Sequence, residues 1–253
     1  MTGREKPADS PEVHRLEDIH FKGPNLDVPN PPATLPYDRI EDWRSSKLLA
    51  INGIPETEKA LIEALQTQSS VLLSAAAHAS SSLPAAIPFL REVMHGPDDY
   101  AAVEAAYALT RLGEEDGKKH LLDSLQRPLT AYLSPILAAG YLAQLGDSSG
   151  LPVERAGLES DFLATSMLAC KQLFFFMPFH GKTDSSGSRI DVLELFTLAL
   201  NNPDPTVQAQ ALGQLRLLRR PETRMLLESY LERTEDRYLS DLARQILADI
   251  SQA

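Results

Sequence analysis

The stretch Ala105-Ala106-Tyr107-Ala108-Leu109-Thr110-Arg111-Leu112-Gly113 decides the fold, because it recurs along the chain. A second copy lies 33 residues further on and reads Ala138-Ala139-Gly140-Tyr141-Leu142-Ala143-Gln144-Leu145-Gly146. Looser copies read Met167-Leu168-Ala169-Cys170-Lys171-Gln172-Leu173 and Ala209-Gln210-Ala211-Leu212-Gly213-Gln214-Leu215. All four share a small residue, an apolar neighbour and a leucine three positions later, which places these side chains on one helical face.

The segments around these copies also have helical periodicity. Residues 118–126 follow the first copy and residues 222–233 follow the last, each with leucines at helical spacing. Gly113 and Gly146 stand where the end of a helix needs a residue in the left-handed conformation. Antiparallel helix pairs at this period predict an all-α fold, an α-solenoid in which each pair buries its apolar face against the next.

The helical pattern begins well inside the chain. It predicts helices over 56–66 and 69–79, and a third that starts near Leu83 with Pro84 in its first turn. We therefore divide the chain into a proline-rich N-terminal arm, residues 1–42, and a helical body, residues 43–253. The arm is either a disordered leader or an extended segment held against the body by its apolar side chains. Those side chains are Phe21, Leu26, Tyr37 and, just beyond the arm, Trp43.

Two turns carry a resemblance to a known family. Asp98-Asp99-Tyr100-Ala101-Ala102-Val103-Glu104-Ala105-Ala106 and Asn202-Pro203-Asp204-Pro205-Thr206-Val207-Gln208-Ala209-Gln210-Ala211-Leu212 each run from an Asp or Pro turn through a valine to small and apolar residues. This pattern resembles HEAT repeats, in the short subtype found in phycobilisome lyases, and the resemblance covers about residues 56–253. It implies a superhelix of helix pairs. Glu104 and Gln208 stand where such repeats often have arginine.

Composition limits the classes of function. The 253 residues carry a formal charge of −11, which opposes binding to a phosphate backbone and makes nucleic acid an unfavourable partner. No stretch approaches the roughly 20 apolar residues of a membrane helix, and the N-terminus has no apolar signal-peptide core. A single cysteine, Cys170, rules out an intramolecular disulfide. We expect a cytoplasmic protein with no membrane partner.

The sequence contains no pattern that indicates catalysis. No two of the six histidines are spaced three or four residues apart, and none is followed directly by glutamate, so we expect no metal. The chain has no glycine-rich phosphate loop and no Gly-x-Ser-x-Gly elbow. Cys170 lies at a core position of its repeat, where cysteine is usually an inert small hydrophobe. We therefore predict no catalytic residue and no cofactor.

An inserted loop near 178–189 separates the last two copies of the motif, which are 42 residues apart. Insertions of this kind often lie on the binding face of a repeat protein. The cluster Phe174-Phe175-Phe176-Met177-Pro178-Phe179 precedes it, and three consecutive phenylalanines cannot all face one core stripe of a helix. Either these rings are buried on two sides, or Phe176 or Phe179, beside His180, forms an exposed contact point for a partner.

A basic cluster, Arg216, Arg219, Arg220 and Arg224, stands out in this acidic chain. These arginines either form a solvated face that pairs with Glu222 and Glu228, or a docking patch for an acidic partner. The candidate partner-binding residues are Phe176, Phe179, His180, Arg216, Arg219 and Arg220.

The leading hypothesis is a non-catalytic scaffold or adaptor that binds another protein through the surface of the solenoid. The repeat subtype suggests an alternative, a chromophore-lyase-like enzyme or enzyme subunit with a ligand pocket. Nucleic-acid binding is a weaker third alternative, because HEAT-like DNA glycosylases combine basic patches with stacking aromatics and this chain has only one tryptophan, Trp43.

Overall fold

The computed structural model describes residues 55–251, apart from short gaps at 67–69, 130–132, 185–186 and 219–220. Within these residues it contains twelve α-helices, three short 3-10 helices and no β-strand, which confirms the predicted all-α class. The predicted arm, residues 1–42, lies outside the described residues, as do residues 43–54. None of the described helices combines the length and the apolar character needed to cross a membrane.

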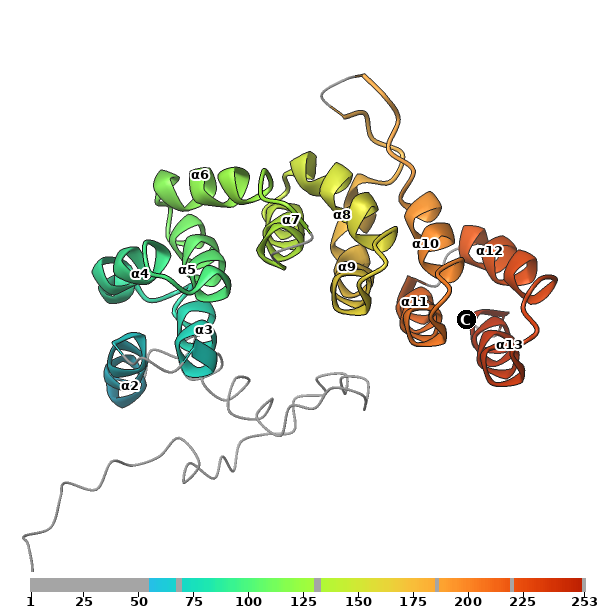
Figure 1. Ribbon diagram of the computed structural model, residues 1–253, viewed down its shortest axis with the longest axis horizontal. Coiled ribbons are helices and arrows are strands. Elements are labelled where there is room, and N and C mark those ends of the chain that lie inside the picture. Colours follow the sequence, from blue (N-terminus) through green and yellow to red (C-terminus); the bar gives the residue numbers. More distant parts are fainter. Residues whose placement is uncertain (1–54, 67–69, 130–132, 185–186, 219–220, 252–253) are drawn as a thin grey trace, which may run out of the picture.

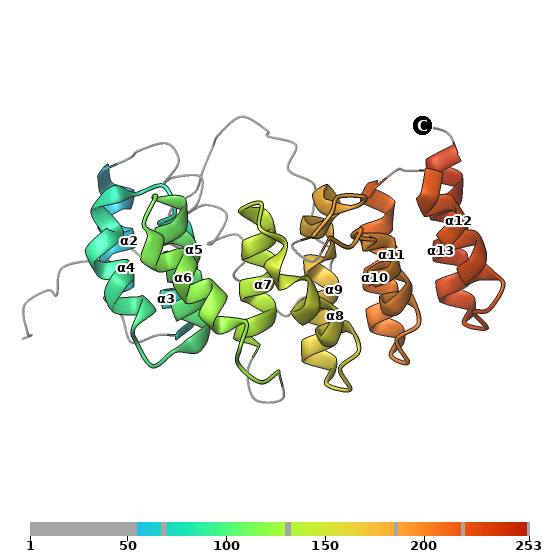
Figure 2. The ribbon, with the colours of Figure 1, turned by 90° about the horizontal axis from the view of Figure 1, so that it is seen from above.

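The helices form two rows (Figures 1 and 2). One row contains α2 (Pro55–Leu65), α4 (Ile87–Met94), α6 (Glu115–Ser124), α8 (Leu151–Leu158), α10 (Val192–Leu200) and α12 (Pro221–Leu231). The other contains α3 (Ser70–Ala79), α5 (Asp99–Arg111), α7 (Ser134–Gln144), α9 (Leu163–Phe176), α11 (Pro205–Leu218) and α13 (Arg237–Ser251). In each pair the even-numbered helix packs on the odd-numbered helix that follows it, and the odd-numbered helices also pack on one another in chain order. Figure 1 shows that the stack is curved, with the even-numbered row on its outer side.

The four copies of the motif lie in α5, α7, α9 and α11, four neighbouring helices of the odd-numbered row. Their small residues allow the next element to approach closely. A Cβ added at Gly117 would lie 2.4 Å from the Ala106 carbonyl oxygen, and one at Gly150 would lie 2.5 Å from the Ala139 Cα. Both pairs are related by the same 33-residue shift, so the sequence period and the packing period coincide.

The turns at the ends of α5 and α7 and at the start of α5 have the backbone conformations and hydrogen bonds expected from their residues. Gly113 and Gly146 have φ values of 89° and 83°, which confirms the predicted left-handed conformation at the ends of α5 and α7. Behind them, the backbone N–H of Glu114 donates to Leu109 and that of Asp147 donates to Leu142, so carbonyls at both helix ends are satisfied. The Asp98 carboxylate caps α5 by accepting from the N–H groups of Tyr100 and Ala101.

The buried apolar side chains form two cores that meet at α7. The first core runs from Leu61 to Leu142 and the second from Ile136 to Ile246. In α7, Leu137 and Tyr141 belong to the first core, whereas Ile136 and Ala139 belong to the second. A single helix therefore couples two apolar units, as expected when each pair buries its faces against both neighbours.

The connection between α9 and α10 is longer than its counterparts and projects beyond the even-numbered row (Figure 1). It begins with a 3-10 turn, Met177–Phe179, so the first two residues of the loop expected near 178–189 are helical. Thr183 and Arg189 then form an isolated antiparallel bridge. Hydrogen bonds of 2.8 Å from Gly181 N to Ile190 O and from Ile190 N to Lys182 O close its base.

Candidate functional site

Phe176 and Phe179 are buried, so the expectation that either ring is an exposed contact point is wrong. Their exposed fractions are 0% and 7%, and both belong to the second core. The reason is helical geometry: Phe176 follows Ala169 and Leu173 by seven and three residues, and all three lie on the core face of α9. Phe174, on another side of the helix, is 43% exposed and packs edge-on against Phe175 at a centroid distance of 6.2 Å.

His180 holds the base of the inserted loop against α10. The backbone N–H of Val192 donates to its Nδ1 over 3.2 Å, and the same Nδ1 lies 3.4 Å from Oδ1 of Asp191. Asp191 in turn caps α10 by accepting from the N–H of Leu193. His180 is thus half-buried and serves the local fold, and a contact between it and a partner stays a prediction.

Two arginines of the basic cluster, Arg216 and Arg224, form ion pairs within the chain. The guanidinium of Arg216, on α11, lies 3.0 Å from a carboxylate oxygen of Asp249 on α13. Arg224 Nε lies 2.8 Å from Oε1 of Glu228, one turn along α12, which is one of the two expected pairings. Arg219 and Arg220 lie outside the described residues. Whether any of these arginines binds a partner stays a prediction.

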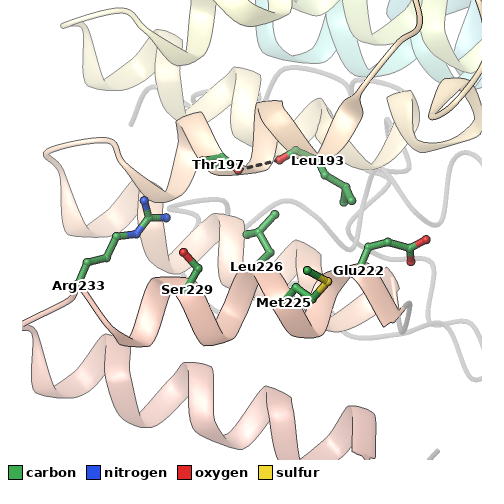
Figure 3. A pocket seen from close by; sticks show the side chains of 7 residues that line it. All are labelled: Leu193, Thr197, Glu222, Met225, Leu226, Ser229 and Arg233. Carbon is green, nitrogen blue, oxygen red and sulfur yellow. Dashed lines mark hydrogen bonds between the residues drawn. The ribbon is translucent and has the colours of Figure 1, made fainter.

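An open groove runs between α10 and α12 on the outer row, and we call it the α10–α12 groove (Figure 3). Its volume is about 370 Å³. Its lining residues are Leu193, Thr197, Glu222, Met225, Leu226, Ser229 and Arg233. Met225 is 72% exposed, the largest fraction among the described large hydrophobic side chains. Such an exposed thioether beside two leucines is typical of a contact surface, since Met adapts its shape to many partners.

The groove lies where a series of ion pairs along the outer row ends. From α4 to α10, each outer helix is tied to the next one, or to the turn that precedes it, through basic and acidic side chains. The pairs are Arg91 with Glu114 and Asp116, Lys118 with Asp147, and Arg155 with Glu194. The last is bidentate, with N–O distances of 3.0 and 2.7 Å. Among the described residues no ion pair joins α10 to α12, and the groove occupies that position instead.

The groove has uncharged polar side chains, Thr197 and Ser229, between its ends and charged side chains at its ends. The Thr197 hydroxyl donates to the Leu193 carbonyl over 3.1 Å, so its proton is already used within α10. Figure 3 shows Glu222 at one end of the groove and Arg233 at the other. The Arg233 guanidinium lies 6.0 Å from the centre of the Tyr230 ring. The groove therefore combines an apolar floor with opposite charges at its two ends.

A buried polar cluster joins α3, α5 and α7, and sequence reasoning did not find it. The carboxylate of Glu104 lies 2.7 Å from Nδ1 of His78 and accepts a hydrogen bond from the Tyr141 hydroxyl. The Tyr141 ring stacks on Tyr107 at a centroid distance of 4.2 Å. Burial and the neighbouring carboxylate raise the pKa of Tyr141 well above its usual value, so its hydroxyl remains a donor. Glu104, which stands where the repeats that this chain resembles often have arginine, thus joins three neighbouring helices of the odd-numbered row.

Gln208, the other departure from the common repeat pattern, has a similar role in the second core. Its Oε1 accepts from the Tyr230 hydroxyl over 2.5 Å, and its Nε2 donates to the Asn202 carbonyl over 2.7 Å. Both departures therefore form hydrogen bonds between neighbouring elements. In the sequence, each of them stands out as a polar residue in a helix that is rich in small residues. Their hydrogen-bond partners could not be identified without knowledge of how the helices pack.

Two buried titratable groups of the second core lack a catalytic setting. Burial raises the pKa of the Cys170 thiol, and its Sγ lies 3.6 Å from the Val207 carbonyl to which it donates. Burial alone raises the pKa of Glu154 well above its usual value, and neither of its carboxyl oxygens has a hydrogen-bond partner among the described residues. In the described part of the chain, no cluster of three or more His, Cys, Asp or Glu side chains could hold a metal ion.

No protein-family model matches the sequence, and no curated protein matches it. The fold is similar to that of an engineered protein, at 16% identity over 79% of this chain and 98% of the other, with a TM-score of 0.45. It is similar to the complex of CpcE and CpcF of phycocyanin lyase from Nostoc sp. PCC7120, at 17% identity over 92% and 99% of the chains and a TM-score of 0.42. Human deoxyhypusine hydroxylase matches at 14% identity over 85% and 90%, with a TM-score of 0.33. At these values the likenesses assign no activity or partner to this chain.

Proposed function

We propose that this chain is a HEAT-like α-solenoid that acts as a non-catalytic scaffold and binds another protein through the α10–α12 groove. The observation that carries the proposal is the exposed apolar floor of this groove, formed by Met225 with Leu193 and Leu226, where the ion pairs of the outer row end. Contact between apolar surface and water is unfavourable, so a partner that covers this floor would gain free energy by removing it from water.

The shape and charges of the groove favour a helix as the bound segment. The groove follows α12 from Glu222 to its end at Leu231, which corresponds to about 14 Å of helix at a rise of roughly 1.5 Å per residue, and it reaches Arg233 just beyond that end. A helix has a partial positive charge at its N-terminus and a partial negative charge at its C-terminus. We therefore expect an amphipathic helix of the partner with its N-terminus at Glu222, its C-terminus at Arg233 and its apolar face on Met225.

The test is affinity capture from the native cells with the full chain immobilised, followed by mass spectrometry. Met225→Glu introduces a charge into the groove, whereas Tyr238→Glu changes a side chain of matching exposure, 70%, on α13 outside the groove. We expect one protein to be captured by the wild-type chain and by Tyr238→Glu, and to be lost with Met225→Glu. Equal capture by the two variants would contradict docking in the groove.

The alternative function is a chromophore-lyase-like enzyme or enzyme subunit. It requires a small-molecule site, and grooves of a few hundred Å³ are large enough for one. Titration with bilins tests it, because a bound pigment changes its absorbance spectrum. An unchanged spectrum at all concentrations would remove this alternative and leave the scaffold proposal as it stands.

A further inference from the structure

A second groove lies where the α8–α9 turn and the α10–α11 turn stand beside each other, and we call it the turn groove. Its volume is about 550 Å³, and none of its lining residues also lines the α10–α12 groove. Its apolar part comes from Leu163, Leu198, Pro203 and Pro205. Phe162, next to Leu163 in the sequence, is 57% exposed, so an aromatic side chain is accessible close to this apolar part.

The polar part of the turn groove is acidic. Glu159, Asp161 and Asp204 line it, and its lining includes no lysine or arginine. Hydrogen bonds from Thr206 lower the pKa of Asp204, which keeps that carboxylate ionised. Glu159 and Asp161 are exposed, and in the described part of the chain neither forms an ion pair. Arg155, one turn before Glu159, attracts it electrostatically, but the guanidinium forms its ion pair with both carboxylate oxygens of Glu194.

The dipole of α8 does not explain the position of Glu159. It is the C-terminal cap of α8, where the partial negative charge of the helix end disfavours a carboxylate and favours a cation. Asp204 is different, because it accepts the Thr206 N–H at the start of α11 and so has a structural role of its own. An exposed acid at a helix C-terminus, without an ion pair among the described residues and three positions from an exposed phenylalanine, suits a surface whose cation is supplied by another molecule.

We propose that the turn groove binds a basic segment of a partner protein, with lysine or arginine side chains against Glu159 and Asp161 and an apolar anchor against Phe162 and Leu163. The argument is charge complementarity: three carboxylates without a basic residue in the groove attract a cationic segment, and the apolar wall gives it a fixed position. The net charge of −11 steers the same segment toward the protein. This surface is additional to the α10–α12 groove.

The experiment measures fluorescence anisotropy of a labelled amphipathic peptide of lysine, leucine and alanine, titrated with the full chain. A peptide with glutamate in place of lysine is the probe control. We expect binding of the lysine peptide that weakens as salt is added, and no binding of the glutamate peptide. The double variant Glu159→Lys, Asp161→Lys should weaken binding at least about tenfold, and Phe162→Ser by about threefold or more.

Control variants test whether the loss of peptide binding is specific to the turn groove. Glu92→Lys with Glu115→Lys makes the same change in net charge on exposed residues of α4 and α6, and should change the affinity by less than about twofold. Tyr238→Glu, on α13 and outside both grooves, should also leave peptide binding unchanged. The capture experiment with Met225→Glu tests the α10–α12 groove separately, so failure of that proposal and failure of this one are distinguishable. Circular dichroism of each variant establishes that its helices are intact.

Three outcomes would overturn the proposal. The first is equal binding of the two peptides, which would indicate apolar adhesion alone. The second is an equal loss of affinity in the two charge-reversed double variants, which would indicate a general effect of net charge. The third is self-association in sedimentation velocity that Glu159→Lys with Asp161→Lys abolishes, because the occupant would then be a second copy of this chain.

Discussion

In the first core the buried carboxyl of Glu104 has two hydrogen-bond partners, His78 and Tyr141, whereas in the second core the buried carboxyl of Glu154 has none. The two cores share α7 and the same motif, yet the first has polar contacts across three helices, whereas the second buries Phe176, Phe179 and Phe196 and has a polar contact between Gln208 and Tyr230. The helix period is therefore the same along the chain, whereas the side-chain contacts that stabilise the helix interfaces differ between the two cores. The C-terminal half also carries both grooves.

The strongest test of this contrast is Phe176→Ala. Phe176 is fully buried in the second core, so its truncation should lower the free energy of unfolding by about 3–5 kcal/mol. Phe174→Ala, two positions earlier on the same helix, removes a side chain that is 43% exposed and should cost less than about 1 kcal/mol. Urea unfolding of both variants measures the difference. Similar losses would mean that α9 is not oriented as described.

Removal of the polar contacts of the first core should have the next largest effect. Glu104→Ala leaves the buried Tyr141 hydroxyl and His78 Nδ1 without this partner, and should lower the unfolding free energy by about 2–3 kcal/mol. Near-UV circular dichroism should change as well, because Tyr107 and Tyr141 are stacked. The control is Glu92→Ala, an exposed glutamate on α4, which should have no measurable effect. A neutral result for Glu104→Ala would mean that the cluster does not hold α3, α5 and α7 together.

Substitution of Glu154 should have the opposite sign. Glu154→Met removes an unpartnered buried carboxyl at similar volume, and we expect it to raise the unfolding free energy by about 1–3 kcal/mol near neutral pH. The folded state keeps the Glu154 proton above the ordinary pKa of 4.5, at which the unfolded chain releases it. The wild type therefore loses stability as pH rises through this window, by up to about 1.4 kcal/mol per pH unit from this group.

The variant lacks this proton, so its advantage over the wild type should widen as pH increases from about 4.5. Urea midpoints of the two proteins over a series of pH values measure the gap. A constant gap would mean that Glu154 is ionised in the folded protein and has a partner there.

Two glycine substitutions should give the smallest effects, with opposite signs. Gly146→Ala, at the junction between the two cores, places a Cβ on a residue with φ of 83° and should cost about 1 kcal/mol. Gly213→Ala, on the exposed side of α11 with no atom within 4 Å of the new Cβ, should stabilise by about 0.5–1 kcal/mol. Thermal melts of both variants measure the shifts. A stabilising Gly146→Ala would contradict the left-handed end of α7.

The repeated motif predicted the helices and the glycine turns because both depend on local chemistry. Spacing of Leu and Ala marks a helical face, and a glycine after a leucine marks the helix end at Gly113. The exposed alternative for Phe176 and Phe179 was wrong because the outcome depended on neighbouring elements. Helical spacing from Leu173 could have identified Phe176 as a core residue, but the adjacency of α10 and α12 that forms their groove has no signature in the sequence. The same holds for the contact between Glu104 and His78, which are 26 residues apart.

Photo-crosslinking from the groove tests the central claim most directly. The single cysteine of the chain, Cys170, is buried, so Met225→Cys offers one accessible thiol for a benzophenone label. Glu92→Cys, on α4, is the matched control on the outer row. Irradiation in extract of the native cells should link a helical segment of one protein to the label at position 225 and not to that at position 92. Identical crosslinks from both positions, or none from position 225, would contradict a partner seated in the α10–α12 groove.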